Sequence, residues 1–340
     1  MGIIRLLLAA SVLSIHFNPS AGFSNFGEVL AVNAFFIISG FYMSLIINEK
    51  YNLKHNSYWT FLTNRFLRIY PIYWIILILT ILFNYFLLKS VASGNIFLYR
   101  PIFDIISDFT LLIRTDYFNL NAIFGNSPTI IVAWTLVIEL TFYVLAPFIV
   151  KRKLWIIILL AVLSLLAKYG VAYYEMLRRD YHKPGFFLAS LCFFMLGVVS
   201  YRIYVRIKNR KIPKKLSVSA LLFLIFLIVF WRSIPSIFSY HQFYLKDWGY
   251  YFFLTASIPL IFLLFKSNPL ESLLGKISYP VYVSHVLVGD FLHHNFGLKT
   301  GNLNAFAVIF IATIIFSFLL VRFVDEPIDK YRQNRLKKIK

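Results

Sequence analysis

Residues 129–150 read TIIVAWTLVIELTFYVLAPFIV, a run of 22 residues in which Glu139 is the only charged one. The hydrocarbon core of a bilayer is about 30 Å thick, and a helix needs about 20 apolar residues to cross it. The run therefore predicts a membrane-spanning helix. A lone carboxylate is unfavourable in lipid, so Glu139 is expected to face a cavity, to pair with a cation or to carry a proton.

Further apolar segments occur along the whole chain of 340 residues, of which 60% are hydrophobic and only 14% charged. Soluble domains average about 25% charged residues, so this chain has too little charge to cover a water-facing surface. The sequence predicts an all-α fold, a polytopic membrane helix bundle of about ten transmembrane helices. We expect a single integral-membrane domain over residues 1–340, with no appended soluble domain. The other apolar segments are residues 3–17, 28–47, 69–88, 154–174, 184–204, 216–234, 248–265, 277–291 and 303–324.

The net charge of +20 would suggest nucleic acid binding in a soluble protein. Here the basic residues cluster in short loops: ten spans place 24 of the 34 Lys and Arg on the side of the N-terminus and nine on the other. Because cytoplasmic loops carry the excess of Lys and Arg, both termini are expected to be cytoplasmic. We therefore expect a multi-pass protein of the inner (cytoplasmic) membrane, with no nucleic acid partner. Residues 90–128 contain no clear span and are expected to pack on the outer face.

Ionisable residues in or beside the apolar segments are the candidates for chemistry. Arg5 and His16 are eleven residues apart, which returns to within about 20° of the same helix face about 16 Å further along. Arg65 and Arg68, at i and i+3, point two guanidiniums the same way and could hold an anionic donor. The three arginines equally fit the positive-inside rule. His16 equally fits an interfacial polar residue and His285 a hydrogen-bonded structural histidine, so both interpretations stay open.

Six motifs follow one another along the chain: Arg5-(ten residues)-His16, FFIISGF at 35–41, RFLRIYP at 65–71, WTLVIELTFY at 134–143, ISYPVY at 277–282 and FVDEP at 323–327. In this order they resemble the membrane-bound acyltransferase-3 family over nearly the whole chain. Each motif alone is weak, but six in register are specific. Asn33 and Asn64 depart from the family pattern, in which an acid and a further basic residue are common.

The resemblance implies about ten helices and transfer of an acyl group, usually acetyl from acetyl-CoA, to glycan hydroxyls. The acceptors of this family are glycans such as O-antigen, exopolysaccharide or oligosaccharide signals. The resemblance also implies that His16 is the catalytic residue with Arg5 as its partner, and that Arg65 and Arg68 serve the donor.

We therefore expect a membrane O-acyltransferase that uses acetyl-CoA as donor co-substrate and no metal. His16 is expected either to act as general base on the acceptor hydroxyl or to take the acyl group itself. Glu139 joins His16 and Arg5 as a catalytic candidate. Possible acceptor contacts are His285, Tyr282 and Ser39. The expected partners are acyl-CoA, a glycan or lipid-linked oligosaccharide of the cell surface, such as lipopolysaccharide, and membrane lipid.

The alternative function is a secondary transporter or exporter of a glycan or lipid, without covalent chemistry. Such proteins commonly show inverted repeats with broken helices in matching halves, and the sequence shows no such halves.

Overall fold

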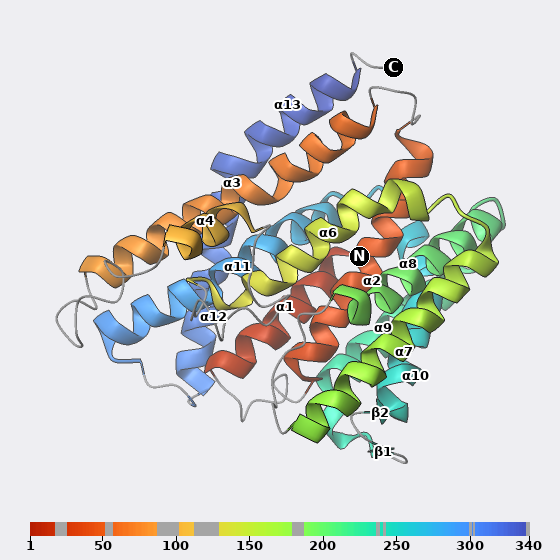
Figure 1. Ribbon diagram of the computed structural model, residues 1–340. Coiled ribbons are helices and arrows are strands. Elements are labelled where there is room, and N and C mark those ends of the chain that lie inside the picture. Colours follow the sequence, from red (N-terminus) through yellow and green to blue (C-terminus); the bar gives the residue numbers. More distant parts are fainter. Residues whose placement is uncertain are drawn as a thin grey trace.

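The computed structural model is a bundle of long helices (Figure 1). It describes residues 1–17, 26–51, 57–86, 102–111, 129–178, 187–235, 239–240, 243–298, 301 and 303–337. In lipid every backbone polar group needs a partner within the protein, and a helix supplies one for nearly all of them. The longer helices are α1 (Gly2–Phe17), α2 (Glu28–Glu49), α3 (Ser57–Phe86), α6 (Trp134–Ile149), α7 (Leu154–Arg178), α8 (Phe187–Ile207), α9 (Lys214–Val229), α10 (Leu245–Phe265), α11 (Pro269–Phe296) and α12 (Leu303–Leu320).

Shorter elements complete the described chain. They are α4 (Ile102–Thr110), the 3₁₀ turns Ile131–Ala133 and Trp231–Ser233, a π-helical turn Val321–Asp325 and α13 (Glu326–Lys337). A two-residue antiparallel pair joins β1 (Ser239–Tyr240) to β2 (Phe243–Tyr244). The fold is therefore helical apart from this one small pair among the described residues.

Every apolar segment predicted from the sequence lies in or overlaps one of these helices. Within the described residues, six helical stretches are long and apolar enough to cross a membrane: Glu28–Glu49, Tyr58–Phe86, Ile131–Ile149, Phe187–Ile207, Leu245–Phe265 and Leu303–Arg335. Gly2–Phe17 and Leu154–Gly170 are apolar but shorter. The multi-pass membrane character is supported, and the number of about ten crossings stays a prediction.

The structure changes the expected position of the Arg65–Arg68 pair. The apolar segment was expected to begin at residue 69, which places the pair at the start of the helix. Instead α3 begins at Ser57, so the two arginines lie more than two turns inside it. The first turns of α3 mix aromatic and polar residues and continue the same helix, so the apolar stretch begins at Tyr58 and not at residue 69.

Close backbone contact at two glycines joins α2 to α8. A Cβ at Gly40 would lie 2.2 Å from the carbonyl oxygen of Phe194, and one at Gly197 would lie 2.1 Å from that of Ile37. Membrane helices associate largely through such close packing at small residues. The ring of Phe194 also stacks between those of Phe36 and Phe142, with centroids 4.8 and 4.1 Å away. These contacts hold α2, α6 and α8 as one rigid group.

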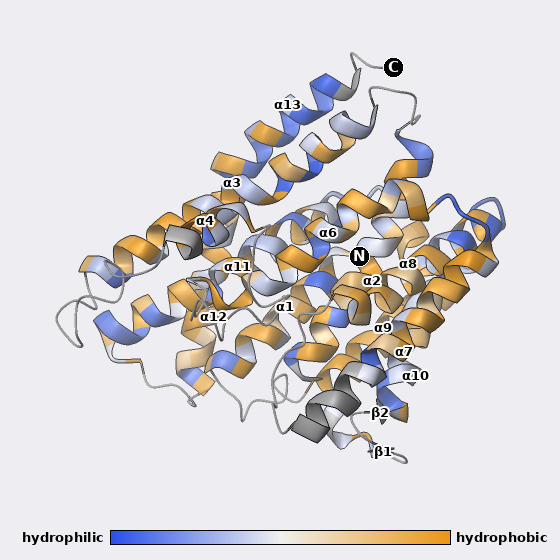
Figure 2. Ribbon diagram, in the orientation of Figure 1, coloured by the Kyte–Doolittle hydropathy of each residue, from blue (hydrophilic) through white to orange (hydrophobic). Residues whose placement is uncertain are grey.

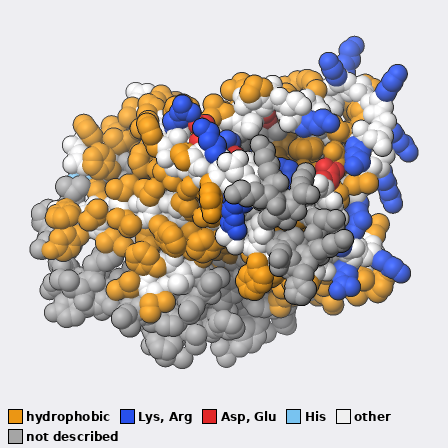
Figure 3. Space-filling model, turned by 90° about the horizontal axis from the view of Figure 1, so that it is seen from above, with side chains coloured by type: hydrophobic (Ala, Val, Ile, Leu, Met, Phe, Trp, Pro, Cys, Tyr) orange, Lys and Arg blue, Asp and Glu red, His pale blue; other side chains and the backbone are white. Residues whose placement is uncertain are grey.

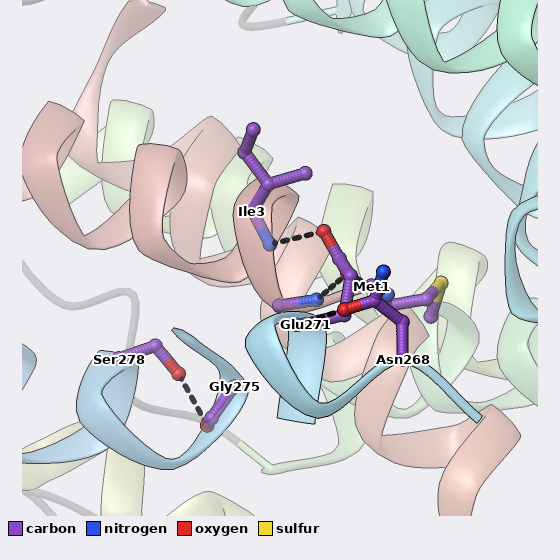
Figure 4. Close-up of polar contacts among 7 residues, drawn as sticks. Met1, Ile3, Asn268, Glu271, Gly275 and Ser278 are labelled. Carbon is purple, nitrogen blue, oxygen red and sulfur yellow. Dashed lines mark hydrogen bonds and ion pairs between the residues drawn. The ribbon is translucent and has the colours of Figure 1, made fainter. Parts of the chain in front are cut away.

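The N-terminus of α1 is held by the first turn of α11 (Figure 4). Asn268 caps α11 by accepting a hydrogen bond from the Glu271 amide at 3.1 Å. The Glu271 carboxylate accepts hydrogen bonds from the amide of Gly2 at 2.5 Å and from that of Ile3 at 3.4 Å. It also pairs with the amino group of Met1. A carboxylate at a helix N-terminus satisfies otherwise unpaired N–H groups, so Glu271 fixes the position of α1 along α11.

A further helix, α13, follows the last predicted apolar segment, which ends at residue 324. The π-helical turn joins α12 to α13, which runs beside the N-terminal part of α3 (Figure 1). Arg332, on α13, is 6% exposed. The packing of a highly charged helix such as α13 is hard to predict from the sequence, because the helix has few apolar residues.

Polar and apolar residues are distributed as a membrane protein requires. Hydrophobic residues dominate the long helices, and hydrophilic ones concentrate in the loops beside α7 and α8 and in α13 (Figure 2). Seen from above, Lys and Arg side chains gather toward the right-hand end, and apolar side chains cover much of the left (Figure 3). Which end faces the cytoplasm stays a prediction.

Most of residues 90–128, expected to pack on the outer face, lie outside the described residues. Within that region α4 packs against α3 through three hydrogen bonds to α4 carbonyl oxygens. Tyr70, Tyr73 and Trp74 of α3 donate them to Thr110, Asp108 and Phe109 respectively.

Candidate functional site

A cavity of about 560 Å³ opens among α1, α2, α3, α6, α10, α11 and α13. Its lining runs from residues at the helix ends, such as Met1, Lys50 and Lys266, to residues in mid-helix, such as Ser39 and Glu139. Because these helix ends surround one space, they lie at the same end of the bundle. The cavity therefore leads from one end of the bundle toward the middle of the protein.

The lining carries more positive than negative side chains. The basic residues are Arg5, Lys50, Arg65, Arg68, Lys266, Lys276 and Arg332, and the acidic ones are Glu49, Glu139, Glu271 and Asp329. One of these carboxylates, Glu271, is already occupied by the N-terminus of α1. The cavity is thus suited to a ligand with negative charge.

Arg5, Arg65 and Arg68, which the sequence singled out separately, meet in this cavity. The charges of Arg5 and Arg68 lie close enough to repel each other, as do those of Arg65 and Arg68. Arg65 is 7% exposed, and its Nε has no hydrogen-bond partner among the described residues. Gly275 lies next to Arg5, because a Cβ there would be 3.7 Å from one guanidinium nitrogen, an ordinary contact distance. Converging guanidiniums with free N–H groups favour the binding of an anion.

Glu139 faces the cavity and is solvated by two hydroxyl groups. Ser39 of α2 donates a hydrogen bond of 2.8 Å to its Oε1, and Tyr143, one turn further along α6, donates another of 2.5 Å to the same atom. The positive charges of Arg5 and Arg68 also act on Glu139. The sequence left three possibilities for Glu139: to face a cavity, to pair with a cation or to carry a proton. The structure shows that it faces a cavity. Ser39, predicted as an acceptor contact, contacts Glu139 itself.

Tyr282 lies at the inner part of the same cavity. Its hydroxyl is 3.0 Å from Thr135 Oγ1, and its ring meets that of Phe35 edge to face with centroids 5.8 Å apart. All three residues line the cavity. Tyr282 therefore faces the cavity, as a residue that contacts the acceptor must. Its role as an acceptor contact stays a prediction.

His16 and His285 do not line this cavity; they contact each other. Their ring centroids are 5.1 Å apart, and the ring of Phe17 lies 6.5 Å from that of His285. His285 Nδ1 is 2.8 Å from the carbonyl oxygen of Tyr282. A carbonyl oxygen only accepts, so this nitrogen donates, and in the neutral ring Nε2 is left with a free lone pair.

The histidine pair carries unused hydrogen-bonding capacity. Nε2 of His16 and Nε2 of His285 are both buried and have no partner among the described residues. Tyr282 precedes His285 by three residues, so the cavity reaches within about one helical turn, 5.4 Å, of the pair. Arg5 stands at the other end of α1, where the spacing in the sequence placed it. The site therefore has two parts on one path, a basic cavity and a buried imidazole pair.

Sequence reasoning missed three residues of the cavity that contact its polar groups. Tyr143 could have been found, because a residue at i+4 from Glu139 shares its helix face. Thr135 had no such signal, since its neighbour Tyr282 is on α11. Arg332 pairs with Asp329 on its own helix, but the arginines that it approaches are on α3. Asn33 and Asn64, which depart from the family pattern, donate hydrogen bonds to the hydroxyls of Tyr251 and Tyr51. Both thus have structural partners.

The comparisons with known proteins give one match. A family model described as an acyltransferase domain matches residues 1–322, most of the chain. No curated protein and no solved structure matches. The matched residues contain the histidine pair and every cavity residue except those of α13.

Proposed function

Because the chain belongs to the acyltransferase-3 family, we propose that it is a membrane O-acyltransferase that moves an acetyl group from acetyl-CoA to a hydroxyl of a cell-surface glycan. The observation that carries the proposal is the cavity with Arg5, Arg65 and Arg68 toward one end and Glu139 and Tyr282 deeper inside. Acetyl-CoA combines a polyanionic end with a neutral thioester arm. The basic end of the cavity matches the first, and the less basic inner part matches the second. Family membership favours this function over the alternative of a transporter without covalent chemistry.

In the proposed reaction the CoA phosphates bind the guanidiniums, and the thioester arm extends past Tyr282 toward His16. A histidine with a free ring nitrogen suits proton transfer near neutral pH. His16 removes the proton of the acceptor hydroxyl, whose oxygen attacks the thioester carbonyl. The carbon–sulfur bond then breaks, CoA leaves as a thiol once it has gained a proton, and the acceptor gains an ester.

A two-step route uses the same residues. His16 first takes the acetyl group on a ring nitrogen with release of the CoA thiol, and the acceptor oxygen then displaces it. Acceptor-independent release of one equivalent of thiol distinguishes this route from direct transfer. His285 stands beside His16 in both routes, where it contacts the acceptor or orients the reacting ring.

For the orientation we propose that the basic end of the cavity faces the cytoplasm, where acetyl-CoA is made, and that the protein lies in the inner membrane. The acceptor, a glycan or lipid-linked oligosaccharide such as lipopolysaccharide, then approaches the histidine pair from the other side. The glycan receives its acetyl group without the donor leaving the cytoplasmic side.

The proposal is tested with purified protein in detergent, supplied with acetyl-CoA and glycan fractions of the host cell. We expect release of CoA thiol that depends on a glycan fraction, together with an acetyl ester on that glycan by mass spectrometry. Surface glycan from cells with and without the gene should differ by the same group. Thiol release that no acceptor stimulates, with unchanged surface glycan, would contradict the glycan acceptor.

A further inference from the structure

Three cavity residues come from α13, which lies beyond the residues matched by the family model. Asp329, Arg332 and Gln333 all line the cavity. They stand at i, i+3 and i+4, so one face of α13 closes the basic end of the space. This face has no role in the site that the sequence predicted.

Arg332 is more buried than the positive-inside rule requires of a basic residue. Its side chain is 7% exposed, and its Nη1 lies 3.5 Å from Oδ1 of Asp329. Neither its Nη1 nor its Nε has a hydrogen-bond partner among the described residues. Buried N–H groups of a charged side chain are costly when unpaired. A ligand that supplies acceptor oxygens would remove this cost.

The surroundings of Arg332 are mostly of the same sign. The charges of Arg65 and Arg68 both act against it. Asp329 is shared, because its carboxylate also lies 3.9 Å from Nζ of Lys276. The other nearby carboxylate, Asp325, acts on Arg68 as well as on Arg332. Two carboxylates thus serve three cations, Arg332, Arg68 and Lys276, and neither is shared with Arg65. Positive charge is therefore in excess beside N–H groups that have no hydrogen bond.

We propose that Arg332 is the third guanidinium of an anion site, with Arg65 and Arg68, that binds a phosphate group at the basic end of the cavity. Under the proposed function, on which this assignment of the ligand rests, the phosphate is one of those of the acyl-CoA donor. Guanidiniums bind phosphate oxygens in bidentate geometry, and a phosphate group carries about two negative charges near neutral pH. One phosphate supplies both the missing charge and the missing acceptors.

The test measures binding of CoA, inorganic pyrophosphate and pantetheine to the purified full-length protein by titration calorimetry. We expect R332Q to bind CoA and pyrophosphate about 10- to 150-fold more weakly, the effect of losing hydrogen bonds to a charged group. R332K, which keeps the charge without the bidentate geometry, should lose less. Pantetheine, which has no phosphate, should bind both proteins alike. The matched control is K330Q, which removes an exposed charge from the same helix outside the cavity and should bind CoA as the parent does.

Thermal unfolding separates a ligand-binding role from a structural one. If Arg332 serves to bind an anion, R332Q removes its repulsion with Arg65 and Arg68. The ligand-free variant should then unfold at the melting temperature of the parent or above it. CoA should raise that melting temperature less than it does in the parent. A lower melting temperature without ligand, together with unchanged CoA affinity in R332Q, would overturn the inference. The inference would also be overturned if R332Q weakened pantetheine binding as much as it weakened CoA binding.

The same titrations distinguish this inference from the proposed function. CoA binding that R332Q leaves unchanged overturns the inference and leaves the function standing. If the parent binds pyrophosphate but not CoA, and R332Q loses pyrophosphate binding, the phosphate site is supported and the donor is wrong. Binding of neither CoA nor pyrophosphate overturns both.

Discussion

The hydroxyl of Ser39 donates a 2.8 Å hydrogen bond to Oε1 of Glu139, and this bond links α2 to α6 inside the cavity. Tyr143 donates to the same oxygen, so the carboxylate is held in one orientation. Both donors would also serve a neutral amide oxygen. The negative charge can therefore be removed with little change in shape.

We predict that Glu139→Gln lowers kcat for acetyl transfer about 5- to 30-fold, because each of the two hydrogen bonds is about 1 kcal/mol weaker to a neutral acceptor than to a charged one. The KM for acetyl-CoA should stay constant or fall, because the substitution removes a negative charge from an anion-binding cavity. Steady-state kinetics with purified protein separate the two constants. Ser39→Ala is the matched control, since it removes one donor and leaves the charge. An unchanged kcat in Glu139→Gln would return Glu139 to a purely structural role.

His16→Ala should abolish acetyl transfer while CoA binding stays near the parent value, because His16 does not line the cavity. Loss of a general base typically costs about 10²- to 10⁴-fold, and loss of a covalent nucleophile at least as much. Turnover and CoA titration on the same preparation measure both effects. His294→Ala, an exposed histidine on α11, should be nearly silent. Near-normal turnover of His16→Ala would show that another group does the chemistry.

Replacing Arg65 and Arg68 with Ala should raise the KM for acetyl-CoA more than that for the glycan acceptor. Each lost charged hydrogen bond is expected to contribute about 1.5–3 kcal/mol. The control is Arg206→Ala, an exposed arginine near the end of α8 that lies outside the cavity. If the donor KM does not move, the pair serves only membrane topology.

Gly40→Ala should destabilise the protein, because its Cβ would lie 2.2 Å from a backbone oxygen of α8. Overpacking of this kind typically costs about 1–3 kcal/mol. Gly170→Ala is the matched control, since a Cβ there meets nothing within 4 Å and glycine is unfavourable inside a helix. We therefore expect thermal unfolding at a lower temperature for Gly40→Ala and at the same or a higher temperature for Gly170→Ala. Equal melting temperatures would mean that α2 and α8 separate easily.

Topology is tested with single cysteines in a Cys192→Ser background. Asn209, in the loop after α8, and Asn295, near the end of α11, are both exposed and lie on opposite sides under the ten-span prediction. A membrane-impermeant thiol reagent added to intact cells should label Asn295→Cys and spare Asn209→Cys. The reverse pattern would place the basic end of the cavity outside the cell, away from cytoplasmic acetyl-CoA.

The helical fold and much of the candidate site could be predicted from the sequence, because their signals are local. Apolar runs long enough to cross lipid have few alternatives to a helix, so every such run from residue 3 to residue 324 overlaps one. An ionisable residue within such a run is costly enough to stand out. This is why Arg5 and Glu139 could be predicted as candidates from the sequence. Arg65 and Arg68 lie just before such a run and were predicted as an i, i+3 pair.

The sequence alone therefore determined which ionisable residues lie in or beside the membrane helices and which helices carry them. Only the tertiary structure decided which of them meet. It placed Ser39 and Tyr143 on one oxygen of Glu139, joined His16 to His285 outside the cavity, and brought Arg332 beside Arg65. These contacts join residues from separate helices, and helix packing depends on close approach at positions such as Gly40 and Gly197, whose partners the periodicity of one helix does not specify.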